Sequence, residues 1–468
     1  MVSFMFYDLI FFLLFTLATI VFLYKRKHNL KRQGLMYLYR TRIGLKIIDW
    51  TSEKFEKILR PMQFLIVGCG YILMGSMIWL LAKFTYIYSV SDIAKQIKIP
   101  PILPLFPYAT DLFKLDFLPP FYFTYWIIII AVIAISHEFA HGIFARLNKI
   151  KVHSTGFGFL GPFLAAFVEP DEKEMQKAKK FTQLSILAAG TFANILMTIL
   201  FGGIMALFFV VSFTPAGINF NSYAESVVPL AAITVVEGMQ INNFNEINNY
   251  LENNMTEIGV EGINYIVPTV SLEYALENNI ERIIVFDDAP AFRANLKSPI
   301  LEIDGEKIVS HSELSNFLDT TLPGDIVNIK TGENGETNEY EIELSERNGK
   351  SFIGIGFKSP SNKGVSGYLT KQLYKIKDPF VHYVPSWNGN FAWFIYNLLW
   401  WIVLINLSVA LVNMLPVGIF DGGRFFYLTI WGLTGSEKLG RKAFSLATWS
   451  IIFILIWLMI VWTFAVII

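Results

Sequence analysis

Six long apolar runs dominate the pattern of hydrophobic and polar positions along the chain. A helix needs roughly 20 apolar residues to cross a hydrocarbon core about 30 Å thick, so each run predicts a transmembrane helix. Between the fourth and fifth runs, a long polar segment rich in Glu and Asp predicts a soluble insert. We therefore expect a polytopic α-helical membrane protein, with about six transmembrane helices and an α+β soluble insert. The runs cover residues 5–24, 64–86, 121–147, 184–213, 391–415 and 444–468.

The first run is similar in length to a signal peptide but differs from one at its end. It lacks a small-residue cleavage site and is followed at once by Lys25, Arg26 and Lys27. Because a cleaved leader needs such a site, we expect a retained anchor.

Basic residues concentrate between the first two runs, and they set the expected orientation. Lys and Arg accumulate on the cytoplasmic side of membrane proteins, so we expect this segment in the cytosol and the N-terminus outside. The third run then descends towards the cytosol, and the fourth returns and delivers the insert to the extracytoplasmic side. The basic residues are Lys25, Arg26, Lys27, Lys31, Arg32, Arg40, Arg42, Lys46, Lys54, Lys57 and Arg60.

Composition agrees with a membrane protein and narrows its functions. Of 468 residues, 54% are hydrophobic and 16% aromatic, which is too apolar for an ordinary soluble protein. The formal net charge is zero, so no attraction to nucleic acid is expected. Cys69 is the only cysteine, which excludes an intrachain disulfide framework and a cysteine-rich metal cluster.

Three ionisable residues, His137, Glu138 and His141, lie inside the third run. Each would cost roughly 2.5 to 3.5 kcal/mol near mid-bilayer, so they need a compensating partner such as a metal ion. Residues four apart share one face of a helix, so the two histidines can offer imidazole nitrogens to one Zn²⁺. Glu138 points to an adjacent face, where it could act as a general base on a water molecule. The alternative is a set of packed or hydrogen-bonded side chains without metal.

A catalytic zinc usually takes three protein ligands, so another His, Asp or Glu is expected at the same membrane level. Asp421 is the only carboxylate between Asp378 and Glu437. In the predicted topology it follows the fifth run at its cytoplasmic end, which is the level expected for His137 and His141. The membrane level expected for Asp421 therefore agrees with the level expected for the two histidines.

The segment around Asp421 has the composition of a broken membrane helix. Pro416 interrupts the helical hydrogen bonds, and Gly422 with Gly423 lets the backbone turn. Asn413 can satisfy the freed backbone groups or bind a substrate main chain. The alternative is a cytoplasmic turn in which Asp421 only caps the next helix.

Together these residues resemble the site-2 protease family of intramembrane zinc metalloproteases. That family carries an H-E-x-x-H helix and a later N-x-x-P with a downstream D-G. The resemblance implies His137, His141 and Asp421 as ligands of one Zn²⁺ per chain, with Glu138 as catalytic base. The matching residues are His137, Glu138 and His141, then Asn413, Pro416, Asp421 and Gly422.

The resemblance also implies contacts to the substrate. A G-x-x-x-N pattern of the family runs here from Gly190 to Asn194. We therefore expect Asn194 and Asn413 to be substrate-binding residues. The chain departs from the common form at Gly418 and Ile419, where many members carry prolines.

A glycine-punctuated apolar segment follows the third run, from about residue 153 to 172. Gly156, Gly158 and Gly161 make it too broken for a spanning helix, and its apolar residues are unusual for a loop. Non-helical backbone at membrane depth is tolerated only where protein covers it or where it lines a cavity. In the family a re-entrant β-hairpin occupies this place, which would let an unwound substrate add as a strand beside the zinc. The alternative is a cytoplasmic surface loop.

The insert contains an internal repeat. The sequence GMQI at 238–241, followed by residues 246–251, aligns with GEKI at 305–308, followed by residues 313–318. Each copy predicts a strand, a turn and a short amphipathic helix. With the APA sequence before the second copy and IGIG at 353–356 after it, the repeat resembles tandem PDZ domains. We expect two PDZ-like units that bind peptide termini or act as a size filter, the alternative being a folded spacer.

The expected domain order has five parts. Residues 1–60 would form a transmembrane anchor with a basic cytoplasmic segment, and the likeness to the family covers only residues 121–213 and 391–426. The first two runs therefore look like an added N-terminal hairpin. The remaining parts are residues 61–213 and 361–468 for the membrane core, with PDZ-like units at 214–285 and 286–360.

We predict an intramembrane zinc metalloprotease that hydrolyses peptide bonds in or near the transmembrane segment of membrane-anchored proteins. It would be a multi-pass protein of the cell membrane, with the lipid bilayer around an active site near the cytoplasmic side. A rival is a non-catalytic receptor or scaffold that binds peptides through its PDZ-like units and holds a structural zinc. A metal-dependent oxidase with histidine boxes is a further rival, but six histidines are too few for a di-iron arrangement.

Overall fold

The computed structural model describes residues 4–467 except 35, 91–100, 102–104, 116, 161–162, 242, 244–245, 248–249, 252, 279, 334–335 and 360–363. The chain divides into two compact units. One comprises Met1–Met205 with Phe394–Ile468, and the other comprises Ala206–Trp393. We call them the membrane unit and the insert unit.

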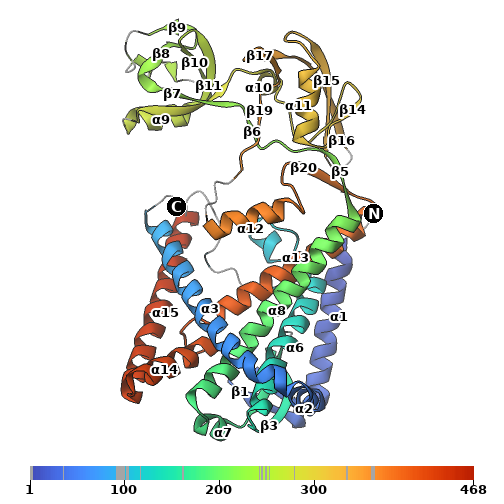
Figure 1. Ribbon diagram of the computed structural model, residues 1–468, viewed down its shortest axis with the longest axis vertical. Helices are drawn as coiled ribbons and strands as arrows, with labels where there is room; N and C mark the ends of the chain where they lie inside the picture. Colours follow the sequence, from blue (N-terminus) through green and yellow to red (C-terminus); the bar gives the residue numbers. More distant parts are fainter. Residues whose placement is uncertain are drawn as a thin grey trace. The chain divides into compact units, whose positions relative to one another are not determined.

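Six helices among the described residues are long and apolar enough to cross a membrane, as the six runs predict (Figure 1). Most extend beyond the apolar runs, because a run marks only the part that lipid can cover while helical hydrogen bonds continue into polar residues. α3, for example, begins among the basic residues before its run. The bounds are α1 Phe4–Lys25, α3 Glu56–Val90, α6 Phe123–Leu147, α8 Lys180–Ser212, α13 Gly389–Val412 and α15 Glu437–Ile467.

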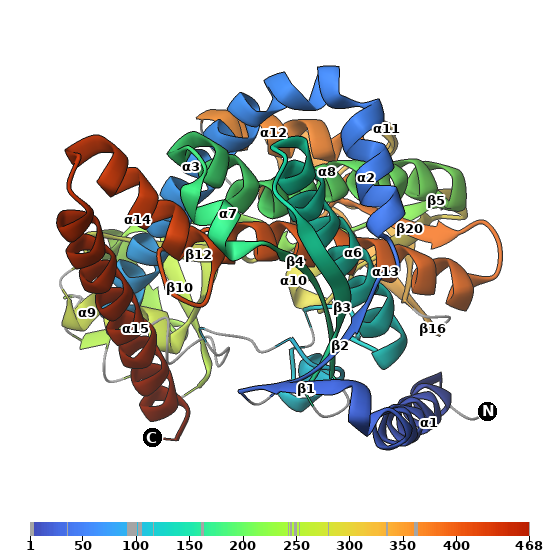
Figure 2. The same cartoon turned by 90° about the horizontal axis from the view of Figure 1, so that it is seen from below.

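A four-stranded antiparallel sheet accompanies these helices, in the order β1-β2-β3-β4 (Figure 2). The glycine-punctuated segment forms β3 and β4, as predicted, although Gly161 lies outside the described residues. Gly156 leaves no room for a side chain, because a Cβ there would lie 2.5 Å from the Phe167 ring. The strands are β1 Leu30–Gln33, β2 Met36–Thr41, β3 Val152–Leu160 and β4 Phe163–Pro170.

The first two spans and the segment between them pack into the membrane unit. β1 and β2 come from the segment between these spans, and β2 pairs with β3 from Tyr37↔Phe159 to Thr41↔Thr155. Arg40 on β2 also reaches across β3 to Glu169 on β4, with N–O distances of 2.9 and 2.8 Å. Sequence patterns could not reveal this pairing because the strands are far apart in the chain.

Asp8 of α1 caps the start of α6. Its carboxylate is 2% exposed and accepts hydrogen bonds from the N–H groups of Phe123 (2.7 Å) and Thr124 (2.9 Å). The hydroxyls of Thr124 and Tyr108 donate to it as well. The first N–H groups of a helix have no partner within that helix, and Tyr122 at the N-cap provides no side-chain acceptor. The first span therefore supplies the cap that the α6 sequence lacks.

Gln63 of α3 joins α6 to α8. Its Oε1 accepts hydrogen bonds from Asn148 Nδ2 (2.9 Å), just after α6, and from the Ser185 hydroxyl (3.0 Å) on α8. The side chain is buried, and a buried polar network favours the one arrangement that satisfies all its members. The second span thus fixes how α6 and α8 pack.

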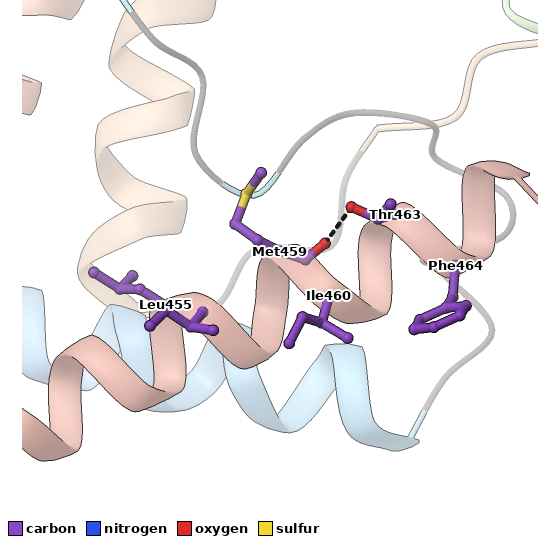
Figure 3. Close-up of a pocket in the computed structure, with 6 residues that line it drawn as sticks. Leu455, Met459, Ile460, Thr463 and Phe464 are labelled. Atoms are coloured by element: carbon purple, nitrogen blue, oxygen red, sulfur yellow. Dashed lines mark hydrogen bonds between the residues drawn. The ribbon is translucent and has the colours of Figure 1, made fainter.

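In the part of the membrane unit that the structure describes, the shorter α-helices are α2 Leu45–Lys54, α5 Ala109–Leu112, α7 Glu172–Lys177 and α14 Asp421–Thr434. A shallow groove of about 350 Å³ runs along α15 between Leu455 and Phe464 (Figure 3). Its walls are apolar except for Thr463, whose hydroxyl donates to the Met459 carbonyl oxygen at 2.8 Å. This surface suits contact with lipid rather than polar chemistry.

The insert unit contains two six-stranded sheets. The first has the order β7-β12-β11-β10-β8-β9; the second has the order β16-β15-β13-β5-β20, with β14 paired to β13. β5, at the start of the first predicted PDZ-like unit, lies in the second sheet. The strands are β5 Phe213–Ile218, β6 Ser222–Tyr223, β7 Glu225–Pro229, β8 Ile233–Val236, β9 Met239–Gln240, β10 Met255–Val260, β11 Ile263–Pro268, β12 Arg282–Asp287, β13 Ile300–Ile303, β14 Glu306–Lys307, β15 Ile326–Glu333, β16 Glu336–Glu343, β17 Ser345–Arg347, β18 Lys350–Phe352, β19 Ile355–Gly356 and β20 Val381–Pro385. The helices are α9 Thr269–Glu277, α10 Pro290–Arg293, α11 His311–Asp319 and α12 Gly364–Tyr374.

The predicted internal repeat is confirmed in the strand pairing. In the first copy, β8 lies between β9 and β10, and β10 pairs in turn with β11. In the second copy, β13 pairs with β14 and with β15, and β15 pairs in turn with β16. Each copy turns on two residues of positive φ, Glu237 with Gly238 and Asp304 with Gly305. The short helix is α11 in the second copy; in the first copy Asn248 and Asn249 lie outside the described residues. The assignment of the two copies to PDZ-like domains stays a prediction.

Asp8→Ala should lower the stability of the membrane unit by about 2 kcal/mol, because it removes an N-cap and leaves buried donors without an acceptor. The measurement is thermal unfolding of the purified protein in detergent. Asp111→Ala removes an exposed carboxylate of α5 and serves as the control. Equal unfolding temperatures for the two variants would show that the cap contributes nothing.

Candidate metal centre

α6 carries two histidines on one face, and α14 brings a carboxylate to them. The Nε2 atoms of His137 and His141 lie 3.1 Å apart, and Asp421 Oδ2 lies 3.4 and 3.3 Å from them. The three side chains are 9, 13 and 26% exposed, so the cluster is largely buried. The structure thus brings together the three residues predicted as metal ligands.

α8 supports both imidazoles through residues spaced four apart. His141 Nδ1 lies 2.7 Å from the Ile186 carbonyl oxygen. Because a carbonyl only accepts, Nδ1 carries the proton and donates it, which leaves the Nε2 lone pair towards the cluster. One turn further on, a Cβ at Gly190 would lie 2.5 Å from His141 Nε2 and 2.6 Å from His137 Nε2. Only glycine lets α8 approach the rings this closely.

Asn194, one more turn along α8, supports His137. Its side chain is fully buried, with Nδ2 3.1 Å from His137 Nδ1, and its Oδ1 has no hydrogen-bond partner among the described residues. A histidine that binds a metal through Nε2 keeps its proton on Nδ1 and donates it. If the Asn194 side-chain amide is rotated by 180°, its Oδ1 accepts this proton from His137 Nδ1. The buried Oδ1 then has a hydrogen-bond partner. The pocket therefore fits a metal-bound form of His137.

Close packing of the backbone aims Asp421. A Cβ on Gly422 or Gly423 would overlap carbonyl groups of the turn formed by residues 414–417. The Gly422 N–H donates to the Asn413 carbonyl oxygen at 2.8 Å, which holds the start of α14 against this turn. Neither glycine has a positive φ, so they are needed for space rather than for the backbone turn that the sequence suggested.

Arg424 ties α14 to two other elements. Its guanidinium donates to Glu172 Oε1 on α7 at 2.7 Å and to Gln183 Oε1 on α8 at 3.4 Å. Because α7 follows β4 closely, this side chain links the helix that carries Asp421 to the strand beside α6. An open cavity of about 550 Å³ lies next to it, lined by charged and aromatic residues of α7, α14 and α15.

Glu138 is half-buried and is oriented by the sheet. Its Oε2 accepts a hydrogen bond from the Val168 N–H on β4 at 2.9 Å. β4 is an edge strand, so this N–H points away from β3 and is available to a side chain. The bond fixes a carboxylate beside His137 in the chain.

The predicted substrate-binding residues have different surroundings. The Asn413 side chain is half-buried and forms no hydrogen bond with the described residues, so it is available to a ligand. Asn194 contacts His137 instead, because it lies fully buried behind the ring. Their contacts to substrate stay predictions.

Sequence reasoning missed the groups that hold the ligands in place. The Ile186 carbonyl and the Val168 N–H are main-chain groups, so their residue types gave no signal. Gly190 did give a sequence signal, because a small residue four positions before an asparagine in a membrane helix indicates a close contact between helices.

The donor set fits zinc. Zinc binds imidazole nitrogen and carboxylate oxygen at about 2.0–2.2 Å, so neighbouring ligands of a tetrahedron lie about 3.3 Å apart. The observed separations are 3.1, 3.3 and 3.4 Å. Three protein ligands leave one tetrahedral position open, and Ile186 and Asn194 supply the partners that metal-bound imidazoles need.

A family-level sequence model described as peptidase family M50 matches residues 125–459, which include the whole metal cluster. The chain belongs to peptidase family M50, the site-2 protease family. With its six apolar helices, the M50 chain is an integral multi-pass membrane protein and a zinc metalloprotease. The match begins after α1, α2 and α3, so these elements lie outside the part shared with the family.

Two curated proteins are similar to the chain over most of its length, and the name of the second agrees with this membership. An uncharacterized protein of Methanocaldococcus jannaschii is 25% identical over 399 residues, which cover 84% of this chain and 78% of the relative. A Borreliella burgdorferi protein named provisionally as a zinc metalloprotease is 22% identical over 416 residues, which cover 71% of this chain and 95% of the relative.

Gly190→Ala should lower zinc affinity by about tenfold or more, because the added Cβ displaces both imidazoles. Gly203→Ala on the same helix is the matched control, since a Cβ there meets nothing within 4 Å. Zinc per chain, measured by metal analysis after dialysis against a weak chelator, decides the outcome. Full zinc retention in Gly190→Ala would mean that the imidazoles do not hold the ion.

Proposed function

We propose that this M50 protein is an intramembrane protease that hydrolyses peptide bonds in or near the transmembrane segment of membrane-anchored proteins, as in regulated intramembrane proteolysis. The depth of the ligands supports this proposal. His137 lies about 21 Å along α6 from Phe123, and His141 lies about 9 Å before its end at Leu147. Ligands at this depth act on a substrate that is itself in the bilayer.

The roles in hydrolysis follow from the contacts. His137, His141 and Asp421 hold one zinc ion, which when bound supplies a Lewis acid that polarises the scissile carbonyl and makes water nucleophilic near neutral pH. The Glu138 carboxylate accepts a proton from the attacking water and returns it to the departing amide nitrogen. The Val168 N–H keeps this carboxylate in position throughout.

The edge of β4 that faces away from β3 pairs with no described strand, so beyond the Val168 N–H held by Glu138 it offers a place for the substrate backbone. A helix in lipid has its carbonyls committed to hydrogen bonds, so a transmembrane substrate must unwind before hydrolysis. An edge strand presents unpaired N–H and C=O groups that an extended peptide can pair with. β4 also orients Glu138, so a substrate strand on this edge lies beside the base. The Asn413 amide steadies the same main chain.

The insert selects substrates in this proposal. The basic segment between α1 and α3 supports an orientation with the N-terminus and the insert outside the cytosol and the active site nearer the cytoplasmic side. The two repeat copies, as PDZ-like domains, bind extracytoplasmic peptide termini or exclude large ectodomains.

The rival of a scaffold with a structural zinc would need a closed ligand shell. A structural zinc generally has four protein ligands. Within the described ranges the cluster contains three, from His137, His141 and Asp421. The open position favours catalysis.

Glu138→Gln should keep one zinc per chain and reduce cleavage by about 10²–10⁴-fold, because the amide cannot accept the proton. Glu174→Gln, an exposed carboxylate on α7, is the control. Cleavage of a transmembrane peptide in vesicles and metal content are measured together. Retained proteolysis would reject Glu138 as the base.

Ala166→Pro should reduce cleavage by about tenfold without unfolding the protein. Ala166 precedes Val168 by two residues on β4, so its N–H also points to the free edge, where proline leaves the pairing with β3 intact. Ala166→Ser keeps the N–H and is the matched control. Equal rates for both variants would exclude pairing of the substrate with this edge.

A further inference from the structure

α2 presents an outward face that no other described segment covers. Ile47 and Trp50 are three residues apart and are 57% and 53% exposed, whereas Ile48 and Ser52 face inward and are buried. Lys54, one turn after Trp50, lies with its Nζ 4.5 Å from the Trp50 ring centroid. A short helix with exposed aliphatic and aromatic residues and a basic side chain is typical of the membrane interface.

The position of α2 in the chain places it at the membrane surface. It lies between the spans α1 and α3, and Phe55 alone separates it from Glu56, the first residue of α3. Exposed apolar residues continue its outward face on both sides, at Ile43 and Ile58. The exposed charged residues around this face are Arg42, Lys46, Lys54 and Lys57 with Glu53 and Glu56, so positive charge is in excess. Their charge complements an anionic headgroup layer.

The inward face of α2 packs directly on the catalytic helix. A Cβ at Gly44, the residue before α2, would lie 2.5 Å from the Phe139 ring, next to Glu138. A Cβ at Gly142 would lie 2.9 Å from Ile48 Cδ1 and 3.1 Å from Val168 Cγ1, so both side chains lie against this glycine.

Further along α2, Asp49 and Arg146 form an ion pair of 2.8 Å that ties α2 to the last turn of α6. The first half of α2 is therefore held to α6 at Gly44, Ile48 and Asp49. Ile48 therefore packs against Gly142 of α6, and Val168 packs against the same glycine from β4 and donates the hydrogen bond that orients Glu138.

We propose that α2 is a lipid-sensing element, whose outward face binds an anionic bilayer surface and whose inward face passes that contact to Glu138 through Ile48 and Val168. The proposal rests on the proteolytic function above. An anionic surface holds the basic residues of α2 in the headgroup layer and fixes Ile48 against Gly142, the glycine on which Val168 also packs. Neutral lipid holds α2 less firmly, so the base is less often in position.

Cleavage rates in vesicles of defined composition test the proposal. The full-length protein should cleave a transmembrane peptide about threefold faster or more in vesicles with about one third phosphatidylglycerol than in pure phosphatidylcholine. Lys46→Gln with Lys54→Gln should abolish the difference. Lys438→Gln with Lys442→Gln, two exposed lysines at the start of α15, should retain it. Equal wild-type rates, or the same loss in both double variants, would overturn the proposal.

A second measurement is independent of catalysis. In a Cys69→Ser background, a nitroxide attached through Trp50→Cys should lie at the boundary of headgroups and acyl chains, and deeper in anionic than in neutral vesicles. The same label at Trp449→Cys, 67% exposed on α15, should not change depth. A label at position 50 that stays in bulk water would reject the membrane contact, whatever the rates.

The variant Ile48→Ala separates the binding of α2 to lipid from the effect of that binding on Glu138. It should keep the depth change of the label and lose the lipid dependence of cleavage, because the packing on Gly142 and Val168 is loosened. Lipid-dependent cleavage that survives this change would reject the proposed route. Absence of cleavage in every vesicle, with the depth change present, would reject proteolysis and the coupling but leave the membrane contact standing.

Discussion

A polar group among apolar helices needs a partner, and this requirement organises the membrane unit. Each imidazole of the metal cluster uses both its nitrogens, one towards the cluster and one towards α8. The same requirement explains Asp8, which satisfies the start of α6, and Gln63, which joins three helices. Polar contacts in lipid cannot be replaced by water, so they determine how the helices pack.

Small residues let these polar contacts form. Gly190 brings α8 against the imidazoles, and Gly422 with Gly423 brings α14 against the preceding turn. In each place a single methyl group would occupy the space of a ligand or of a carbonyl oxygen. The geometry of the metal centre therefore depends as much on the glycines around it as on the three ligand side chains.

Much of this could be predicted from the sequence, because the signals were local. Length and apolarity indicated the spans, and His137 with His141 showed a shared helix face. The sheet was only half predicted, since β3 and β4 are adjacent in sequence whereas β2 joins them from before the second span. Support from main-chain groups, such as the Ile186 carbonyl, carries no residue-type signal and required the fold.

The ligands of the metal centre come from both ends of the membrane unit, with the whole insert between them in the chain. His137 and His141 emerge from the ribosome well before Asp421. A growing chain that has not yet inserted α14 has an incomplete coordination shell. The metal centre of this metalloprotease is therefore completed only late in biosynthesis.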